Sequence, residues 1–300
     1  ASDTTPLAQS NDQPDNTSKD AEQNALFQSL HAQCHSHTRL TAQGYTMTSI
    51  ASLGSHSCKG IIRRDLFRHP SPPGADASGC RKGRQAVVID YKIVQVTRGR
   101  WEIAYLGAVD FLTGEVLINR FVAPRGRVTS WDTKNSGITP SAMAAAIESG
   151  QALRGWLRAR WELWKYVDSD TVLIGHFLNN GLDTLGMIHS RVVDLAILTA
   201  EAVFHTLCPA EPLTRIWGLK ALAGDLLARK VQGGRKGHGV VEDAITIRDV
   251  VIWCLKYPDL LCSWAEKTRT YHDMQEEMKK EGKTKKDKAG RKPDKVKKAK

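Results

Sequence analysis

Three apolar segments that follow one another between residues 86 and 124 constrain the fold of this chain more than any other feature. Segments 86–94, 101–111 and 115–124 are rich in Val, Ile and aromatic residues and alternate with polar ones, which is the pattern of β-strands. Only Leu112, Thr113 and Gly114 separate the second segment from the third. So short a link with a glycine predicts an antiparallel meander.

Helical and strand patterns alternate after this meander. Thr139 followed by Pro140 predicts a helix N-terminus, since threonine caps helices and proline is tolerated at the first helical position. A strand is predicted at 171–176, a further strand at 191–198, and helices to about residue 267. The order predicts an α/β domain in which helices flank a mixed sheet.

A helix predicted at 151–167 carries three tryptophans at helical spacing. They are Trp156, Trp161 and Trp164. Such spacing is typical of one helix face, so we interpret them as packing residues rather than as platforms for stacked bases.

The chain is predicted to divide into four parts. Residues 1–19 are polar and predicted to be disordered. Residues 20–83 form an irregular segment with a short helix that Asp20 caps. Residues 84–266 form one globular domain, and residues 267–300 are a basic, disordered tail.

The segment 20–83 contains scattered cysteines and histidines that are candidate zinc ligands. They are Cys34, His35, His37, His56, Cys58, His69 and Cys80. Their spacing matches no strong zinc signature, and a loop-rich appendage is the favoured interpretation. Six cysteines without a CxxC pair favour a reducing compartment inside the cell.

Positive charge is concentrated at the C-terminal end. The chain has a formal net charge of +11, and the segment 267–300 contains 14 of the 43 Lys and Arg residues but 6 of the 32 Asp and Glu residues. The remainder is close to neutral, so the tail is interpreted as a nucleic-acid contact or a nuclear targeting signal. A solvated charge run is the alternative. No apolar run reaches the length of a membrane span, and no signal peptide is predicted.

The first predicted strand contains an acidic residue in apolar surroundings. Asp90 stands within "VVIDYKIV", and Lys92 lies two residues later on the same face of the strand. Burying an unpaired carboxylate is costly, so Asp90 needs a partner. Either Lys92 neutralises it, or Asp90 belongs to what is left of a metal site.

Seven segments in order resemble the DEDDh 3′→5′ exonucleases, and among them the Rex-type RNA exonucleases of eukaryotes. They are "VVIDYK", "VDFLTGEVLINRFVAP", "WDTKNSGIT", "TVLIGHFLNNGLDTL", "RVVDLAIL", "GLKALAGDLL" and "GHGVVEDA". The resemblance covers about residues 85–257. It implies an RNase H-like fold and a reaction that uses two divalent cations, Mg²⁺ or Mn²⁺, held by about four carboxylates.

The resemblance assigns roles position by position. Asp90 matches the first acidic ligand, Asp243 matches the last, and His238 matches the general base. Lys92 stands where the family has a glutamate, and Gly181 stands where it has an aspartate.

Three nearby acids do not replace the missing ligands. Asp183 and Glu242 are turned away on their helices, and Asp194 matches a position that supports the fold.

The charge balance of the site argues against a working metal pair. Asp90, Asp243 and Lys92 together carry a charge of about −1, too little to hold two dications at close range. We therefore predict that the Lys92 ammonium bridges the two carboxylates. One weakly bound Mg²⁺ or Mn²⁺, or no metal, is expected.

The favoured function is an RNA-binding pseudo-exonuclease in nuclear RNA processing or ribosome biogenesis, located in the nucleus or nucleolus. Single-stranded RNA or an RNA 3′ end is the expected partner, together with proteins of an RNA-processing particle. Lys134, Asn135 and Ser136 are predicted to contact phosphate or sugar, although a simple turn explains the same residues. A weakened metal-dependent 3′→5′ exoribonuclease and a protein-interaction scaffold remain alternatives.

Overall fold

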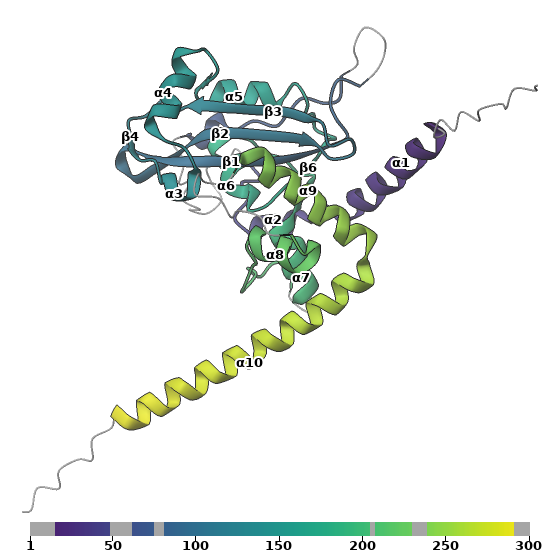
Figure 1. Cartoon of the computed structure of the whole chain (residues 1–300), viewed down its shortest axis with the longest axis vertical. Helices are drawn as coiled ribbons and strands as arrows, with labels where there is room; N and C mark the ends of the chain where they lie inside the picture. Colours follow the sequence, from purple (N-terminus) through teal and green to yellow (C-terminus); the bar gives the residue numbers. More distant parts are fainter. Residues whose placement is uncertain (1–15, 49–61, 75–80, 205–207, 230–238, 291–300) are drawn as a thin grey trace, which may run out of the picture.

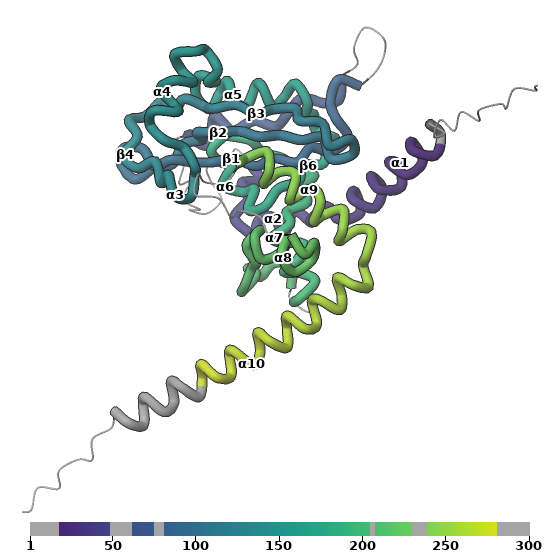
Figure 2. The backbone as a smooth tube through the Cα atoms, in the orientation of Figure 1, coloured from purple at the N-terminus to yellow at the C-terminus, as the bar shows by residue number. Residues whose placement is uncertain are grey.

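The computed structural model describes residues 16–48, 62–74, 81–204, 208–229 and 239–290 (Figures 1 and 2). A mixed α/β body lies at one end, and a long C-terminal helix extends from it. The prediction of an α/β fold with helices around a mixed sheet is confirmed. Predicted disorder in residues 1–15 lies outside the described residues, whereas residues 16–19 are helical.

The sheet has the strand order β5-β3-β2-β1-β6-β7, and β4 pairs with the far end of β1. The pairs β1/β2 and β2/β3 are antiparallel, which confirms the predicted meander, whereas β1/β6, β6/β7 and β3/β5 are parallel. The strands are β1 (Ala86–Val96), β2 (Arg100–Asp110), β3 (Val116–Ala123), β4 (Val128–Ser130), β5 (Leu153–Arg154), β6 (Val172–Gly175) and β7 (Val192–Asp194).

Helices cover both faces of this sheet. One apolar core contains Val87 and Ile89 of β1 together with residues of α5 and α6. The other contains Ala86 and Val88 together with residues of α7, α8 and α9. The helices are α1 (Asn16–Ala32), α2 (His37–Ala42), α3 (Thr133–Ser136), α4 (Pro140–Glu148), α5 (Gly155–Leu163), α6 (Leu178–Leu185), α7 (Leu195–Val203), α8 (Leu219–Leu227), α9 (Val240–Lys256) and α10 (Pro258–Gly290). Short 3-10 turns, η1 (Arg64–Leu66) and η2 (Thr97–Gly99), complete the described elements.

Local sequence signals predicted some of these boundaries correctly and others wrongly. Thr139 caps α4 by accepting a hydrogen bond from the Ala142 N–H at 3.1 Å, as predicted. The strand predicted at 191–198 is wrong beyond Asp194, because the Asp194 side chain accepts the Ala196 N–H and starts helix α7 there.

The helix predicted at 151–167 also differs from the structure, since β5 precedes a shorter α5. Trp156 is buried and Trp164 packs against the core, so the packing interpretation holds for these two. It is wrong for Trp161, which is 61% exposed.

The segment 20–83 is part of the domain rather than an appendage. Leu30 of α1 and Leu40 of α2 are fully buried, in the two different cores. The Tyr45 hydroxyl donates to the Asp194 carboxylate at 2.5 Å, and the His35 imidazole accepts the Asp194 N–H at 3.0 Å. Helix α1 begins at Asn16, so the predicted cap at Asp20 is wrong.

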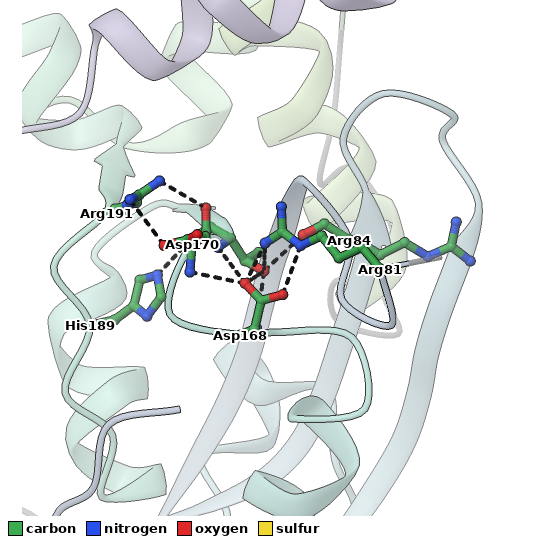
Figure 3. A network of polar contacts seen from close by, with 7 residues as sticks. Arg81, Arg84, Asp168, Asp170, His189 and Arg191 are labelled. Atoms are coloured by element: carbon green, nitrogen blue, oxygen red, sulfur yellow. Dashed lines mark hydrogen bonds and ion pairs between the residues drawn. The ribbon is translucent and has the colours of Figure 1, made fainter. Parts of the chain in front are cut away.

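A polar network fastens the segment before β1 to the start of β6 (Figure 3). The Arg81 guanidinium forms an ion pair with both oxygens of the buried Asp168 carboxylate. Asp168 Oδ1 also accepts the N–H groups of Asp170 and Thr171, at 2.9 and 3.0 Å. Two residues that precede β7 contact the same turn: His189 Nε2 lies 2.6 Å from the Thr171 carbonyl, and Arg191 pairs with Asp170 at 3.0 Å.

Helix α10 corrects the predicted boundary at residue 267. The disordered tail was predicted to begin there, but the helix runs to Gly290, and residues 291–300 lie outside the described residues. Its first half packs on the body: Trp264 stacks edge-on against Trp217, and the Arg269 side chain donates to the Val203 carbonyl. None of the described helices is both long and apolar enough to cross a membrane.

The hydrogen bond between Tyr45 and Asp194 can be used to test whether the 20–83 segment is part of the domain. We expect Tyr45→Phe to lower the free energy of unfolding by roughly 1.5–3 kcal/mol, because a buried hydrogen bond to a carboxylate is lost. Urea unfolding of the whole chain measures it. Tyr105→Phe is the matched control, since it removes a hydroxyl bonded to Asn119 at an exposed site and should cost less than about 0.5 kcal/mol. Equal losses would contradict the structural role of the 20–83 segment.

Candidate active site

The site forms where strand β1 and helix α9 cross. Asp90 lies near the middle of β1, and Asp243 lies in the first turn of α9. The helix approaches the sheet closely at Gly107, which pairs with Asp90 across β1 and β2. A Cβ atom at Gly107 would come within 2.6 Å of the Val240 side chain. A glycine there therefore lets α9 bring Asp243 next to Asp90.

Lys92 lies between the two carboxylates. Its Nζ atom is 3.0 Å from Asp90 Oδ2 and 2.8 Å from Asp243 Oδ2. The side chains of Asp90, Lys92 and Asp243 are 13%, 14% and 4% exposed. The predicted bridge is confirmed, and the ammonium supplies charge-assisted hydrogen bonds to both acids.

The pKa values of Asp90 and Lys92 reflect the burial of these side chains and the charges close to them. Burial raises the pKa of Asp90 to about 6; the Lys92 charge opposes this rise, and the Asp243 charge adds to it. Burial lowers the pKa of Lys92, but the two carboxylates outweigh burial and raise it above its usual value. Lys92 therefore stays charged across the physiological range, whereas Asp90 takes up a proton at a higher pH than an ordinary aspartate does.

Tyr91 fills the space in front of Gly181. A Cβ atom at Gly181 would lie 2.3 Å from Tyr91 Cε1 and 2.5 Å from Cδ1, closer than any such contact in a real protein. The Tyr91 hydroxyl donates to the Phe177 carbonyl, which holds the ring against helix α6. Position 181 can therefore carry no side chain while Tyr91 keeps this position.

Sequence reasoning missed Tyr91. The available signal was the coincidence of a bulky residue between Asp90 and Lys92 with a glycine at position 181. Period-two geometry places the Tyr91 side chain on the other face of the strand from Asp90, so nothing in the local pattern connected it with Gly181. Only the contact between β1 and α6 makes that connection.

The other acids have different partners, as predicted. Asp183 Oδ1 accepts a hydrogen bond from the Thr46 hydroxyl at 2.8 Å. Asp194 accepts the N–H groups of Phe177 and Leu178 at the start of α6. Glu242 is exposed beside the buried Asp243. His238 lies outside the described residues, so its role as a base stays a prediction.

The described residues do not fit a pair of divalent cations. Two-metal sites hold their ions about 3.5–4 Å apart and need carboxylates around both. Here two carboxylates share one ammonium, and the Tyr91 ring fills the space next to Gly181, where the resemblance predicts a third ligand. Within the part of the chain that the structure describes, no group of three His, Cys, Asp or Glu residues is arranged to hold a metal, in this site or in the 20–83 segment.

The loop predicted to contact substrate is held by its own hydrogen bonds. The Ser136 hydroxyl donates to the Trp131 carbonyl at 2.8 Å, and the Asn135 amide donates to the Asp132 carboxylate. Both contacts agree with the turn interpretation. Lys134 is exposed, and its contact with substrate stays a prediction.

A groove of about 400 Å³ lies between this loop and the start of α9. Its lining includes Tyr105, Asn119, Phe121, Ser136, Gly239 and Glu242.

The chain is similar to RNA exonucleases of fungi. It is 31% identical over 168 residues to RNA exonuclease 3 of Candida albicans, covering 56% of this chain and 37% of that protein. It is 30% identical over 151 residues to RNA exonuclease 3 of Saccharomyces cerevisiae, covering 50% of this chain and 33% of that protein. The chain thus spans about a third of the length of these relatives. No family model matches it.

Solved structures support the fold. The pseudoubiquitin hydrolase–RNA exonuclease module of Saccharomyces cerevisiae Pan2 aligns with a TM-score of 0.52 at 20% identity, over 71% of this chain and 38% of that one. The catalytic unit of Neurospora crassa Pan2 aligns with a TM-score of 0.50 at 21% identity, over 71% and 34%. These alignments show a shared RNase H-like fold.

The Lys92 bridge can be tested by its removal. We expect Lys92→Met to lower the free energy of unfolding by roughly 3–5 kcal/mol at pH 8, because two buried carboxylates lose their counter-ion. The loss should shrink towards pH 5, since protonated Asp90 no longer repels Asp243. Lys165→Met is the matched control: it breaks an exposed pair with Glu162 and should cost less than about 1 kcal/mol.

Variant and wild type must be compared at each pH. Because its folded pKa is raised, Asp90 favours the folded state as the pH falls from about 6 towards 3.8. Burial lowers the pKa of His189 to about 4, so His189 disfavours the folded state as the pH falls below 6.5. The difference between the two proteins cancels the His189 contribution. A Lys92→Met protein that is as stable as wild type at pH 8 would refute the bridge as a stabilising element.

Proposed function

Because this chain is a homologue of the DEDDh-type, RNase H-like RNA exonucleases, we propose that it binds RNA with an exonuclease fold but does not cut it. The observation that carries this proposal is the position of Lys92 Nζ, within 3.0 Å of both remaining carboxylates. The ammonium supplies the positive charge that a metal ion supplies in a two-metal nuclease.

The chemistry of phosphodiester hydrolysis explains why this substitution matters. Divalent cations activate the attacking water and stabilise the leaving oxygen. An ammonium group has no open coordination position, so it cannot lower the pKa of a bound water as a metal does. A fold that keeps its carboxylates but neutralises them with lysine therefore retains its shape and loses the means of hydrolysis.

RNA is the proposed ligand on two grounds. The curated relatives are named as RNA exonucleases, and the Saccharomyces cerevisiae Pan2 module has been solved with A7 RNA. Within this chain, the 267–300 segment carries 14 Lys and Arg residues, which favours contact with phosphates. An RNA 3′ end or a single strand is the proposed form, and we propose a role in nuclear RNA processing or ribosome biogenesis.

A weakened nuclease is the second candidate. Asp90 and Asp243 remain side by side and His238 is present in the sequence, which together favour one bound Mg²⁺ or Mn²⁺. For this to occur the cation would have to displace the Lys92 ammonium from both carboxylates. The third candidate function is a protein-interaction scaffold that shares the fold. For a scaffold we expect no salt-dependent affinity for RNA.

Metal-dependent stability separates these functions. We expect Mn²⁺ to leave the melting temperature of the wild-type chain unchanged, with no shortened product from a 5′-labelled single-stranded RNA. Lys92→Glu places a third carboxylate beside Asp90 and Asp243, so Mn²⁺ should raise its melting temperature by binding the folded state. Cleavage should also require Gly181→Asp together with Tyr91→Val, which frees the space for that side chain.

Two outcomes would contradict the proposal. Trimming of RNA by the wild-type chain, lost in His238→Ala, would establish the weakened nuclease. RNA affinity that does not fall as salt is raised would favour the scaffold, since each phosphate contact to a single strand contributes a slope of about −0.7 in log K against log salt.

We also propose that the basic C-terminal segment directs the protein to the nucleus or nucleolus. Ten Lys and Arg residues lie between 283 and 300, beyond the part of α10 that packs on the body. Replacing these ten with Gln should spread a fluorescent fusion through a eukaryotic cell, whereas the unchanged chain should concentrate in the nucleus. Equal nuclear enrichment of both would refute this role.

A further inference from the structure

A basic groove lies at the outer edge of the sheet, away from the candidate active site. Strands β3 and β5 and helix α5 form its walls, and its volume is about 1030 Å³. Figure 1 shows α5 lying along β3 at this edge. Its charged and aromatic lining consists of Arg120, Arg125, Arg154, Arg158, Trp161 and Lys165, with Glu162 as the one acid.

The positive charge of this groove is largely uncompensated. Lys165 pairs with Glu162 at 2.8 Å. Among the described residues, no carboxylate lies within ion-pair distance of the four groove arginines, whereas Arg39, Arg81 and Arg229 each pair directly with a carboxylate. The four are Arg120, Arg125, Arg154 and Arg158. Four arginines thus line one open groove, and the Arg120 guanidinium also donates to the Gln151 carbonyl at 2.8 Å. Such a concentration attracts a polyanion and releases its counter-ions on binding.

An aromatic side chain stands among these arginines. Trp161 is 61% exposed and Leu157 is 42% exposed, one helical turn before it. An indole left open to solvent between cationic side chains contributes little to the core of the domain. Proteins that bind single-stranded nucleic acid combine a basic groove with aromatic rings on which bases stack.

Backbone N–H groups add to the positive electrostatic potential of the groove. Helix α5 begins at Gly155 within the lining of the groove, and no side chain caps its first N–H groups. These donors and the positive end of the helix dipole favour a phosphate oxygen.

The groove is separate from the candidate active site. Asn119 and Phe121 line the smaller groove beside α9, whereas Arg120 between them points to the other face of β3. Two strands, β2 and β3, lie between β1 and β5 in the sheet.

We propose that this groove binds single-stranded RNA, with phosphates on its arginines and a base stacked on Trp161. The proposal deepens the RNA-binding function by adding a site that the active-site chemistry does not require.

Fluorescence anisotropy of the whole chain with a labelled oligouridine, over a series of salt concentrations, tests it. We expect Trp161→Ala to weaken binding about tenfold through lost stacking. Arg154→Ala with Arg158→Ala should reduce the salt slope by about 1.4. The double variant Lys82→Ala with Lys220→Ala removes two exposed charges that line neither groove and should leave both values unchanged. All three groove substitutions are at exposed positions, so melting temperatures near wild type are expected.

The outcomes distinguish this site from the proposed function. Unchanged affinity in the groove variants, with weaker binding in Lys134→Ala, would overturn the groove and leave RNA binding at the candidate active site intact. Absence of RNA binding by the wild-type chain would overturn both. If the groove variants instead lose affinity for a poly-glutamate peptide while RNA binding is unchanged, the groove binds an acidic protein and the proposal is wrong.

Discussion

The ion triad of Lys92, Asp90 and Asp243 is the interaction around which the centre of this domain is organised. It joins the middle of β1 to the first turn of α9, and α9 in turn covers β1 and β2. Buried carboxylates that belong to a metal site require cations to offset their repulsion. In this chain the cation is covalently part of β1, so the folded state needs no bound ion to neutralise these acids.

The Tyr91–Gly181 contact is the second feature that shapes this site. A ring that fills the space of an absent side chain restores close packing between β1 and α6, and the cost of a cavity is avoided. The two features depend on each other, because an aspartate at 181 would clash with the tyrosine. An aspartate at position 181 therefore also needs a smaller residue in place of Tyr91.

The proposed loss of hydrolysis and the proposed binding of RNA rest on different parts of the molecule. The triad lies in a nearly closed region between β1 and α9, whereas the basic groove at β3, β5 and α5 is open and keeps four arginines without acidic partners among the described residues. RNA affinity supplied by such a groove does not depend on metal ions. This separation supports the proposal that the protein holds an RNA strand without shortening it.

The sequence by itself determined the meander, the α/β class and the pairing of Lys92 with Asp90, because period-two alternation and the cost of an unpaired buried charge are local properties. The second arm of the bridge, to Asp243, was predicted from the resemblance to the DEDDh exonucleases. Helical geometry also predicted that Asp183 faces away from the site, and the resemblance gave Asp194 a position that supports the fold. Tertiary structure decided the rest. The packing of the 20–83 segment through Tyr45 and Asp194, the ring of Tyr91 over Gly181, and the exposure of Trp161 among arginines all depend on contacts between residues far apart in the chain. Such contacts produce no periodic pattern in the sequence, because the residues around one partner do not indicate where the other partner lies.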